Sequence, residues 1–129
     1  MTLTGNNGFA VNGIDAGDLS GRALSAAGDV NGDGFEDFLI GAQKGDFGAT
    51  DSGEAYLVFG GASVGSGGSL NLSTLDGTNG YLIGSIDASD LAGRSLGGGG
   101  DLNGDGFADI IVGAVISGSP SSGEVFVVF

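Results

Sequence analysis

The chain has 129 residues, enough for one domain, and its 16 acidic and three basic residues give a formal net charge of −13. This charge argues against nucleic acid as a partner, because no cationic face is available to displace counterions from phosphates. The absence of Cys and His excludes disulfides, thiolate or imidazole metal sites and histidine acid–base catalysis. No apolar run approaches the roughly 18 residues of a membrane span, so no membrane insertion is expected, and no signal peptide is found.

Two copies of one unit fill nearly the whole chain. Residues 3–42 align with residues 75–114 at an offset of 72, and 22 of these 40 positions are identical. After a slightly shorter loop, residues 53–59 align with residues 123–129 at an offset of 70. Self-similarity of this kind indicates a repeat architecture. The chain 1–129 is therefore divided into repeat 1 at about 3–60, a connecting loop at 60–79 and repeat 2 at about 75–129.

Each repeat is expected to form four short strands, and no helix of ordinary length is predicted, so the fold class is all-β. The strands of the first copy cover residues 8–14, 22–28, 37–42 and 55–59, and those of the second copy cover residues 80–86, 94–100, 109–114 and 125–129. The second strand of each copy consists of small residues, which suit a place where backbones come close together. The third has three consecutive apolar residues, which predict burial on both faces. The connecting loop contains an apolar patch at residues 70–75 that we expect to pack as a short excursion.

An oxygen-rich loop precedes the third strand of each copy. Oxygen-bearing side chains occupy relative positions 1, 3, 5 and 9, a Gly stands at position 6, and position 7 can add a backbone carbonyl. Ca²⁺ takes 6–8 oxygen ligands, and a short loop of this kind can wrap it. The sequence therefore predicts two calcium sites, formed by Asp29, Asn31, Asp33, Phe35 and Asp37 and by Asp101, Asn103, Asp105, Phe107 and Asp109.

Other interpretations of the loop fit less well. An EF-hand needs a bidentate Glu at position 12, where this chain has Ile40 or Val112. A plain Asx-rich turn would explain one copy, because Asp, Asn and Gly all favour turns, but two copies that match at all four side-chain positions favour a metal site. Three further acids, Asp46, Asp51 and Glu54, are interpreted as solvated loop residues.

These loops resemble the calcium loops of the FG-GAP repeats found in integrin α-subunit β-propellers and their bacterial relatives. The pattern D-x-N-x-D-G-x-x-D is complete in both copies, whereas the usual Gly-Ala-Pro ending appears as Gly-Ala-Gln and Gly-Ala-Val. The resemblance implies β-propeller blades, each a four-stranded antiparallel sheet. Arg22 and Arg94 each follow a pair of Asp residues, so they could bind a ligand at the channel mouth. We favour instead an ion pair that fastens the preceding loop.

Two repeats do not form a propeller ring alone, so the resemblance raises the question of how the ring is completed. Strands from residues 22–59 together with residues 80–86 would complete one blade, while residues 94–129 supply only three strands of the next. Residues 8–14 of a second copy could pair with the open edge at residues 125–129. We therefore expect head-to-tail homo-oligomerisation that completes a ring, with a trimer of six blades favoured.

The function expected from this resemblance is a non-catalytic calcium-binding module for adhesion or for binding a protein or glycan. Calcium would be structural, with two ions per chain, and the parent protein would be extracellular or at the cell surface. Alternatives are an excised or engineered self-assembling scaffold without activity of its own, and a part of a secreted hydrolase. The hydrolase is disfavoured because most clustered Asp residues already belong to the calcium loops and no G-x-S-x-G elbow occurs.

Overall fold

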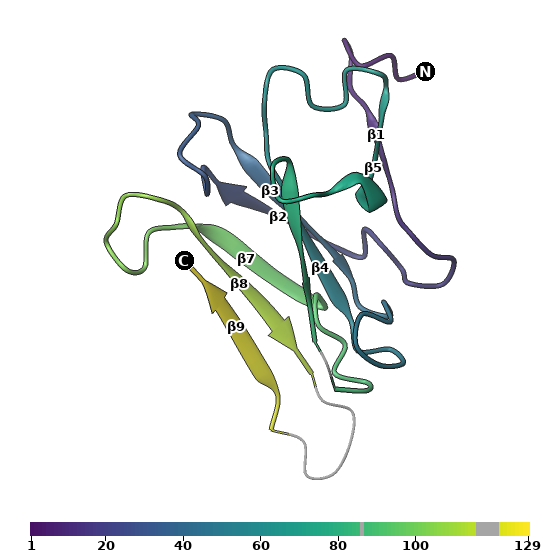
Figure 1. Ribbon diagram of the computed structural model, residues 1–129, viewed down its shortest axis with the longest axis vertical. Helices are drawn as coiled ribbons and strands as arrows, with labels where there is room; N and C mark the ends of the chain where they lie inside the picture. The colour runs from purple at the N-terminus through teal and green to yellow at the C-terminus, as the bar shows by residue number, and fades with distance from the viewer. Residues whose placement is uncertain (86, 116–121) are drawn as a thin grey trace.

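The computed structural model describes residues 1–85, 87–115 and 122–129 and consists of strands with one short 3₁₀ turn, which confirms the all-β prediction (Figure 1). Within these residues no helix is long and apolar enough to span a bilayer. Ile86, the last residue of one predicted strand, lies outside them. The elements in chain order are β1 Ala10–Asn12, β2 Ala23–Gly28, β3 Asp37–Ala42, β4 Glu54–Val58, β5 Ser69–Asn71, η1 Leu72–Thr74, β6 Gly80–Gly84, β7 Ser95–Gly100, β8 Asp109–Ala114 and β9 Glu124–Val128.

The first sheet has four antiparallel strands in the order β2-β3-β4-β6. As predicted, its fourth strand comes from the start of the second repeat. β4 begins at Glu54, one residue before the predicted start, because Glu54 still pairs with Ala42 of β3. Leu39 and Ile40 of β3 are both buried although they point to opposite faces of the sheet, so the predicted burial of this strand on both faces is confirmed.

The second sheet has three antiparallel strands in the order β7-β8-β9 and repeats the pairing of the first. Ile110 pairs with Val128 as Phe38 pairs with Val58, and both β2 and β7 carry a register shift just before their final Gly. Among the described residues β9 has no strand on its outer side, and it forms one flank of the molecule in Figure 1.

The segment predicted as an outer strand at residues 8–14 is shorter in the structure and pairs within the chain. β1 runs parallel to β5 over three residue pairs, from Ala10–Ser69 to Asn12–Asn71. We refer to β1, β5 and η1 together as the lid. Leu72 of η1 is 2% exposed and packs, with Val11 and Leu70, on the first sheet. The predicted apolar excursion is therefore present, with β1 added to it.

The core consists of two apolar clusters, one on each face of the first sheet. The lid and the first sheet enclose Ile40, Ala42, Tyr56, Val58 and Leu72. The two sheets enclose Ala27, Leu39, Leu57 and Ile110, with Leu96 of β7 packed beside them.

Small residues allow the two sheets to approach closely along β2 and β7. A Cβ on Gly98 would lie 2.8 Å from Ala27 Cα, and one on Gly28 would lie 2.9 Å from Gly99 Cα. A larger side chain at either place would force the backbones apart. The sequence-based expectation that these small-residue strands line a close approach of backbones is thus confirmed.

Candidate metal centre

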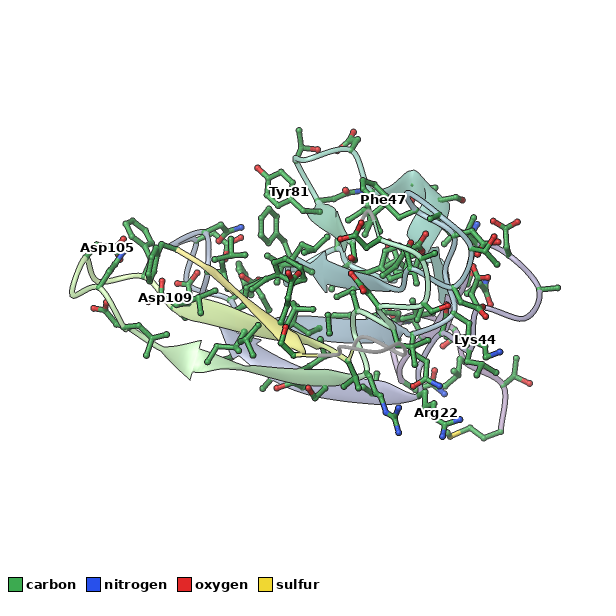
Figure 2. The ribbon with its side chains drawn as sticks, turned by 90° about the horizontal axis from the view of Figure 1, so that it is seen from below. Arg22, Lys44, Phe47, Tyr81, Asp105 and Asp109 are labelled. Carbon is green, nitrogen blue, oxygen red and sulfur yellow. The ribbon has the colours of Figure 1, made fainter. Side chains whose placement is uncertain are left out.

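The two oxygen-rich loops connect β2 to β3 and β7 to β8, and their side chains are largely exposed except at the last ligand position. Asp29 and Asp101 directly follow β2 and β7, whereas Asp37 and Asp109 are the first residues of β3 and β8. Each predicted set of ligands therefore spans the connection between two adjacent strands of one sheet. In Figure 2 Asp105 lies at the tip of the second loop and Asp109 lies further in, at its base.

The first loop is folded around its own carboxylates. Asp29 Oδ1 accepts hydrogen bonds from Gly32 N (2.7 Å) and Asp33 N (3.0 Å), and its Oδ2 accepts one from Gly34 N (2.9 Å). Asn31 Oδ1 accepts from Asp33 N at 3.0 Å. Gly32 and Gly34 have φ values of 75° and 89°, which only Gly adopts without strain. These bonds turn the side-chain oxygens toward the inside of the loop.

The second loop repeats this arrangement. Asp101 accepts from Gly104 N at 2.6 Å and from Gly106 N at 2.9 Å. Asp105 Oδ1 accepts from Phe107 N at 2.9 Å, and Oδ2 accepts from Asn103 Nδ2 at 2.9 Å. These two bonds, the backbone one first, lower the pKa of Asp105 below its ordinary value, so this side chain is a carboxylate at neutral pH.

The last ligand position differs between the loops. Asp37 is 1% exposed, its Oδ2 accepts from Val30 N (2.9 Å), and its Oδ1 accepts from Gly60 N (2.7 Å) beyond β4. Asp109 is 2% exposed, and its Oδ2 accepts from Leu102 N (2.5 Å) and from Asn103 N (3.3 Å), but its Oδ1 has no hydrogen-bond partner among the described residues.

The two loops also contact each other, which sequence reasoning missed. Ala108 N donates to the carbonyl of Asp29 at 3.1 Å. The ring of Phe107 lies so close to Gly32 that a Cβ there would be 2.3 Å from the ring. Phe35 and Phe107 are both about half exposed, at 46% and 45%. Because their side chains carry no oxygen, a metal would use only their backbone carbonyls. The predicted metal sites are therefore neighbours.

The carboxylates of the loops have no cationic partner among the described residues. In that part of the chain one ion pair occurs, between Lys44 Nζ and Asp51 at 3.7 Å. Figure 2 shows Lys44 and Arg22 at the end of the molecule opposite Asp105. Each loop sequence contains three carboxylates at its predicted ligand positions, and no basic side chain of the described residues neutralises their charge. This favours a bound cation.

The donor set fits calcium rather than a softer metal. Every side-chain donor is oxygen, and neither Cys nor His occurs in the chain. As the loops stand, no three acidic side chains of the described residues converge on one point, so calcium would draw them together.

The predicted ion pairs of Arg22 and Arg94 are wrong. Both side chains are exposed, and neither forms an ion pair within the described residues. The preceding loops are fastened through the backbone instead, where Arg22 N donates to the carbonyl of Leu19 and Arg94 N to that of Leu91, both at 3.2 Å. Leu19 and Leu91 adopt positive φ values of 60° and 54°, so a tight turn replaces the ion pair.

The interpretation of Glu54 as a solvated residue is also wrong. Glu54 is 8% exposed, and Tyr56 Oη donates a hydrogen bond to its Oε2. Burial, followed by repulsion from Asp18 and Asp15, raises the pKa of Glu54. Burial likewise raises the pKa of Asp18, which is 7% exposed. Glu54 is buried because it is the first residue of β4 and pairs with β3.

Comparison with known proteins identifies the family to which these repeats belong. The FG-GAP repeat family model matches residues 20–58 and 92–128, which together are more than half of the chain. Integrin alpha-E from Mus musculus is 41% identical over 104 residues, which is 73% of this chain and 8% of the relative. Integrin alpha pat-2 from Caenorhabditis briggsae is 32% identical over 118 residues, 86% of this chain and again 8% of the relative. The chain thus spans less than a tenth of the length of these relatives, and it belongs to the FG-GAP repeat family.

Proposed function

We propose that the chain is a non-catalytic, calcium-binding β-propeller module of the integrin-like type. It would bind a protein or glycan in adhesion, at the cell surface or outside the cell. The observation that carries this proposal is the pair of matching loops, in which uncompensated carboxylates are oriented by the backbone amides of their own loop. The family membership and the integrin alpha relatives support the adhesive role.

Calcium would be held by the same residues in both loops. These are the side chains of Asp29, Asn31, Asp33 and Asp37 with the carbonyl of Phe35, and those of Asp101, Asn103, Asp105 and Asp109 with the carbonyl of Phe107. When bound, calcium neutralises the carboxylates and converts binding free energy into folding free energy. Two ions per chain would change the formal charge from −13 to −9.

Contact between the loops adds a consequence for binding. The carbonyl of Asp29 accepts from Ala108 N, and Phe107 packs on Gly32. Ordering one loop therefore orders part of the other. We expect the two sites to bind with positive cooperativity, because the second ion meets a loop that has already lost part of its freedom.

Calorimetric titration with Ca²⁺ after treatment with EDTA tests the proposal. We expect two ions per chain, and a melting temperature that falls in EDTA and recovers with calcium. Asp33→Asn or Asp105→Asn should each weaken the binding of one ion, because the amide oxygen that replaces the carboxylate at position 5 of one loop carries no formal charge.

Asp76→Asn is the matched control. Asp76 forms an Asx turn with Thr78, at 2.9 Å to its backbone N, but has no ligand pattern around it. This variant should keep both ions. A melting temperature that does not respond to EDTA, together with no calcium heat, would contradict the proposal.

A further inference from the structure

The packing of the two sheets within the chain defines an interface between one blade and the next. In the first sheet we call the face that carries Ile40 the front face and the face that carries Leu39 the back face. The faces of the second sheet are named by the residues that align with these two. The back face of the first sheet, with Leu39 and Leu57, packs against Ile110 and Leu96. The repeat offset equates Ile110 with Phe38 and Leu96 with Leu24, so these are front-face residues of the second sheet. The front of one blade thus covers the back of another.

The front face of the first sheet is only partly covered. The lid shields Ile40, Tyr56 and Val58, but beside it a groove of about 800 Å³ remains. Leu24, Phe38 and Ile40 line this groove together with Leu72 of the lid. Leu24 is 69% exposed, whereas its counterpart Leu96 is half-buried between the sheets. The groove therefore corresponds to the surface that the second sheet uses within the chain.

The back face of the second sheet is open as well. Val125 is 65% and Val127 is 44% exposed, whereas their counterparts Ala55 and Leu57 are 0% and 3% exposed. A shallow hollow on this face is lined by Gly97, Ile111 and Val125. The chain thus exposes both kinds of surface that pack together between its own two sheets, a front face on the first sheet and a back face on the second.

The edge of β9 has a matching strand in the same chain. In the first sheet β6 closes the edge of β4, and the segment that aligns with β6 at the offset of 72 contains β1. β1 and β9 lie on opposite sides of the molecule (Figure 1), so β1 cannot reach β9 of its own chain without leaving its place in the fold. β1 is held by three parallel residue pairs, fewer than the five that join β4 to β6.

We propose that a second copy of the chain completes the open blade, with its front face on the back face of the second sheet and its β1 beside β9. Transfer of the β4–β6 register predicts that Val11 of the second copy pairs with Val125, since Ile83 pairs with Ala55. The contact is head-to-tail and heterologous, so it propagates until the ring closes. Three copies would give six blades. This assembly uses apolar faces and backbone pairing, and it does not depend on the proposed calcium sites.

The chain contains no Cys, so a disulfide trap reports on the register directly. Under mild oxidation Val11→Cys/Val125→Cys should form disulfides between chains, because directly paired residues of antiparallel strands meet the distance requirement. Non-reducing electrophoresis should show multiples of the chain up to the closed trimer. The control Val11→Cys/Val115→Cys has a second Val that is also exposed, at 47% against 65% for Val125, but lies off the β9 edge. Equal cross-linking of both variants, or none in either, would overturn the proposed pairing.

The mass in solution tests the assembly itself. Light scattering at micromolar concentration should give three chain masses, in calcium and in EDTA at a temperature at which the chain is folded. Leu24→Gln should weaken association about tenfold or more, because this exposed apolar side chain lines the groove. A mass of one chain for the unaltered protein would refute the proposal, whatever its calcium titration shows.

Discussion

Replacement of the buried carboxylate at the base of the first loop is expected to have a larger effect than the same change in the second loop. Asp37 holds two amides with separate oxygens, Val30 N within its own loop and Gly60 N after β4. It therefore joins the loop to the far end of the neighbouring strand. Asp109 accepts two amides with a single oxygen, Leu102 N at 2.5 Å and Asn103 N at 3.3 Å, and both lie within its own loop. Asp37→Ala therefore removes a connection to a second strand that Asp109→Ala does not, in an otherwise repeated setting.

The magnitude follows from the number of amides left without an acceptor. A hydrogen bond to a charged group contributes about 1.5–3 kcal/mol, and the release of a poorly solvated carboxylate offsets part of the loss. We expect Asp37→Ala to lower the free energy of unfolding by about 3–4 kcal/mol and Asp109→Ala by less, because the second of its two bonds, from Asn103 N, is long at 3.3 Å. In a chain of this size 1 kcal/mol corresponds to roughly 3–5 °C, so the melting temperature should fall by about 10–15 °C for Asp37→Ala.

The assay is thermal or urea unfolding in EDTA, which removes the contribution of any metal at either site. Asp37→Asn serves as an intermediate variant, since it keeps one acceptor oxygen and should lose less than the Ala variant. If Asp37→Ala and Asp109→Ala proved equally destabilising in EDTA, the bond to Gly60 N would contribute nothing, and the reasoning would be refuted.

Two further predictions concern the approach of the sheets and a buried acid. Gly98→Ala should destabilise the fold by about 1–3 kcal/mol in urea unfolding, because its Cβ would lie 2.8 Å from Ala27 Cα. In Gly67→Ala, in the loop before β5, the Cβ would have no atom within 4 Å, so this variant should be neutral; equal effects would contradict the close approach. Glu54→Gln should stabilise the chain at neutral pH by on the order of 1 kcal/mol, since the raised pKa of Glu54 means that stability falls as pH rises from about 4.5 through the folded-state pKa. The amide can still accept from Tyr56, so the variant's stability should vary less with pH between 4 and 8 in EDTA, and an unchanged slope would count against this explanation.

The sequence was sufficient for the blade architecture because periodicity and propensity agree in each repeat. β3 and β8 begin and end at the predicted residues, since each starts with an Asp whose carboxylate binds the loop and continues with an unbroken apolar run. The origin of the fourth strand was also predictable, because the order of the aligned segments leaves residues 80–86 beside β4 and nothing inside the chain beside β9.

The features that sequence reasoning missed depend on contacts between segments with little pattern of their own. β1 and β5 are strands of three residues, too short for a sequence periodicity to predict their parallel pairing. The contact of Phe107 with Gly32 arises only when two blades stack. The ion pairs expected of Arg22 and Arg94 fail because backbone hydrogen bonds already hold the preceding turns. The ligand positions and calcium remain a prediction, which the geometry of the loops supports.

The place of β6 in the first sheet has a consequence for the order in which the protein can fold during synthesis. β2, β3 and β4 leave the ribosome well before β6, which follows only after β5 and η1. Until Gly84 emerges, the edge of β4 stays open to any other nascent chain. β6 then leads within ten residues into β7, so the event that finishes the first blade also delivers the strand that begins the second. A ribosome that pauses between β4 and β6 would therefore hold the chain with the edge of β4 unpaired, a form prone to aggregation.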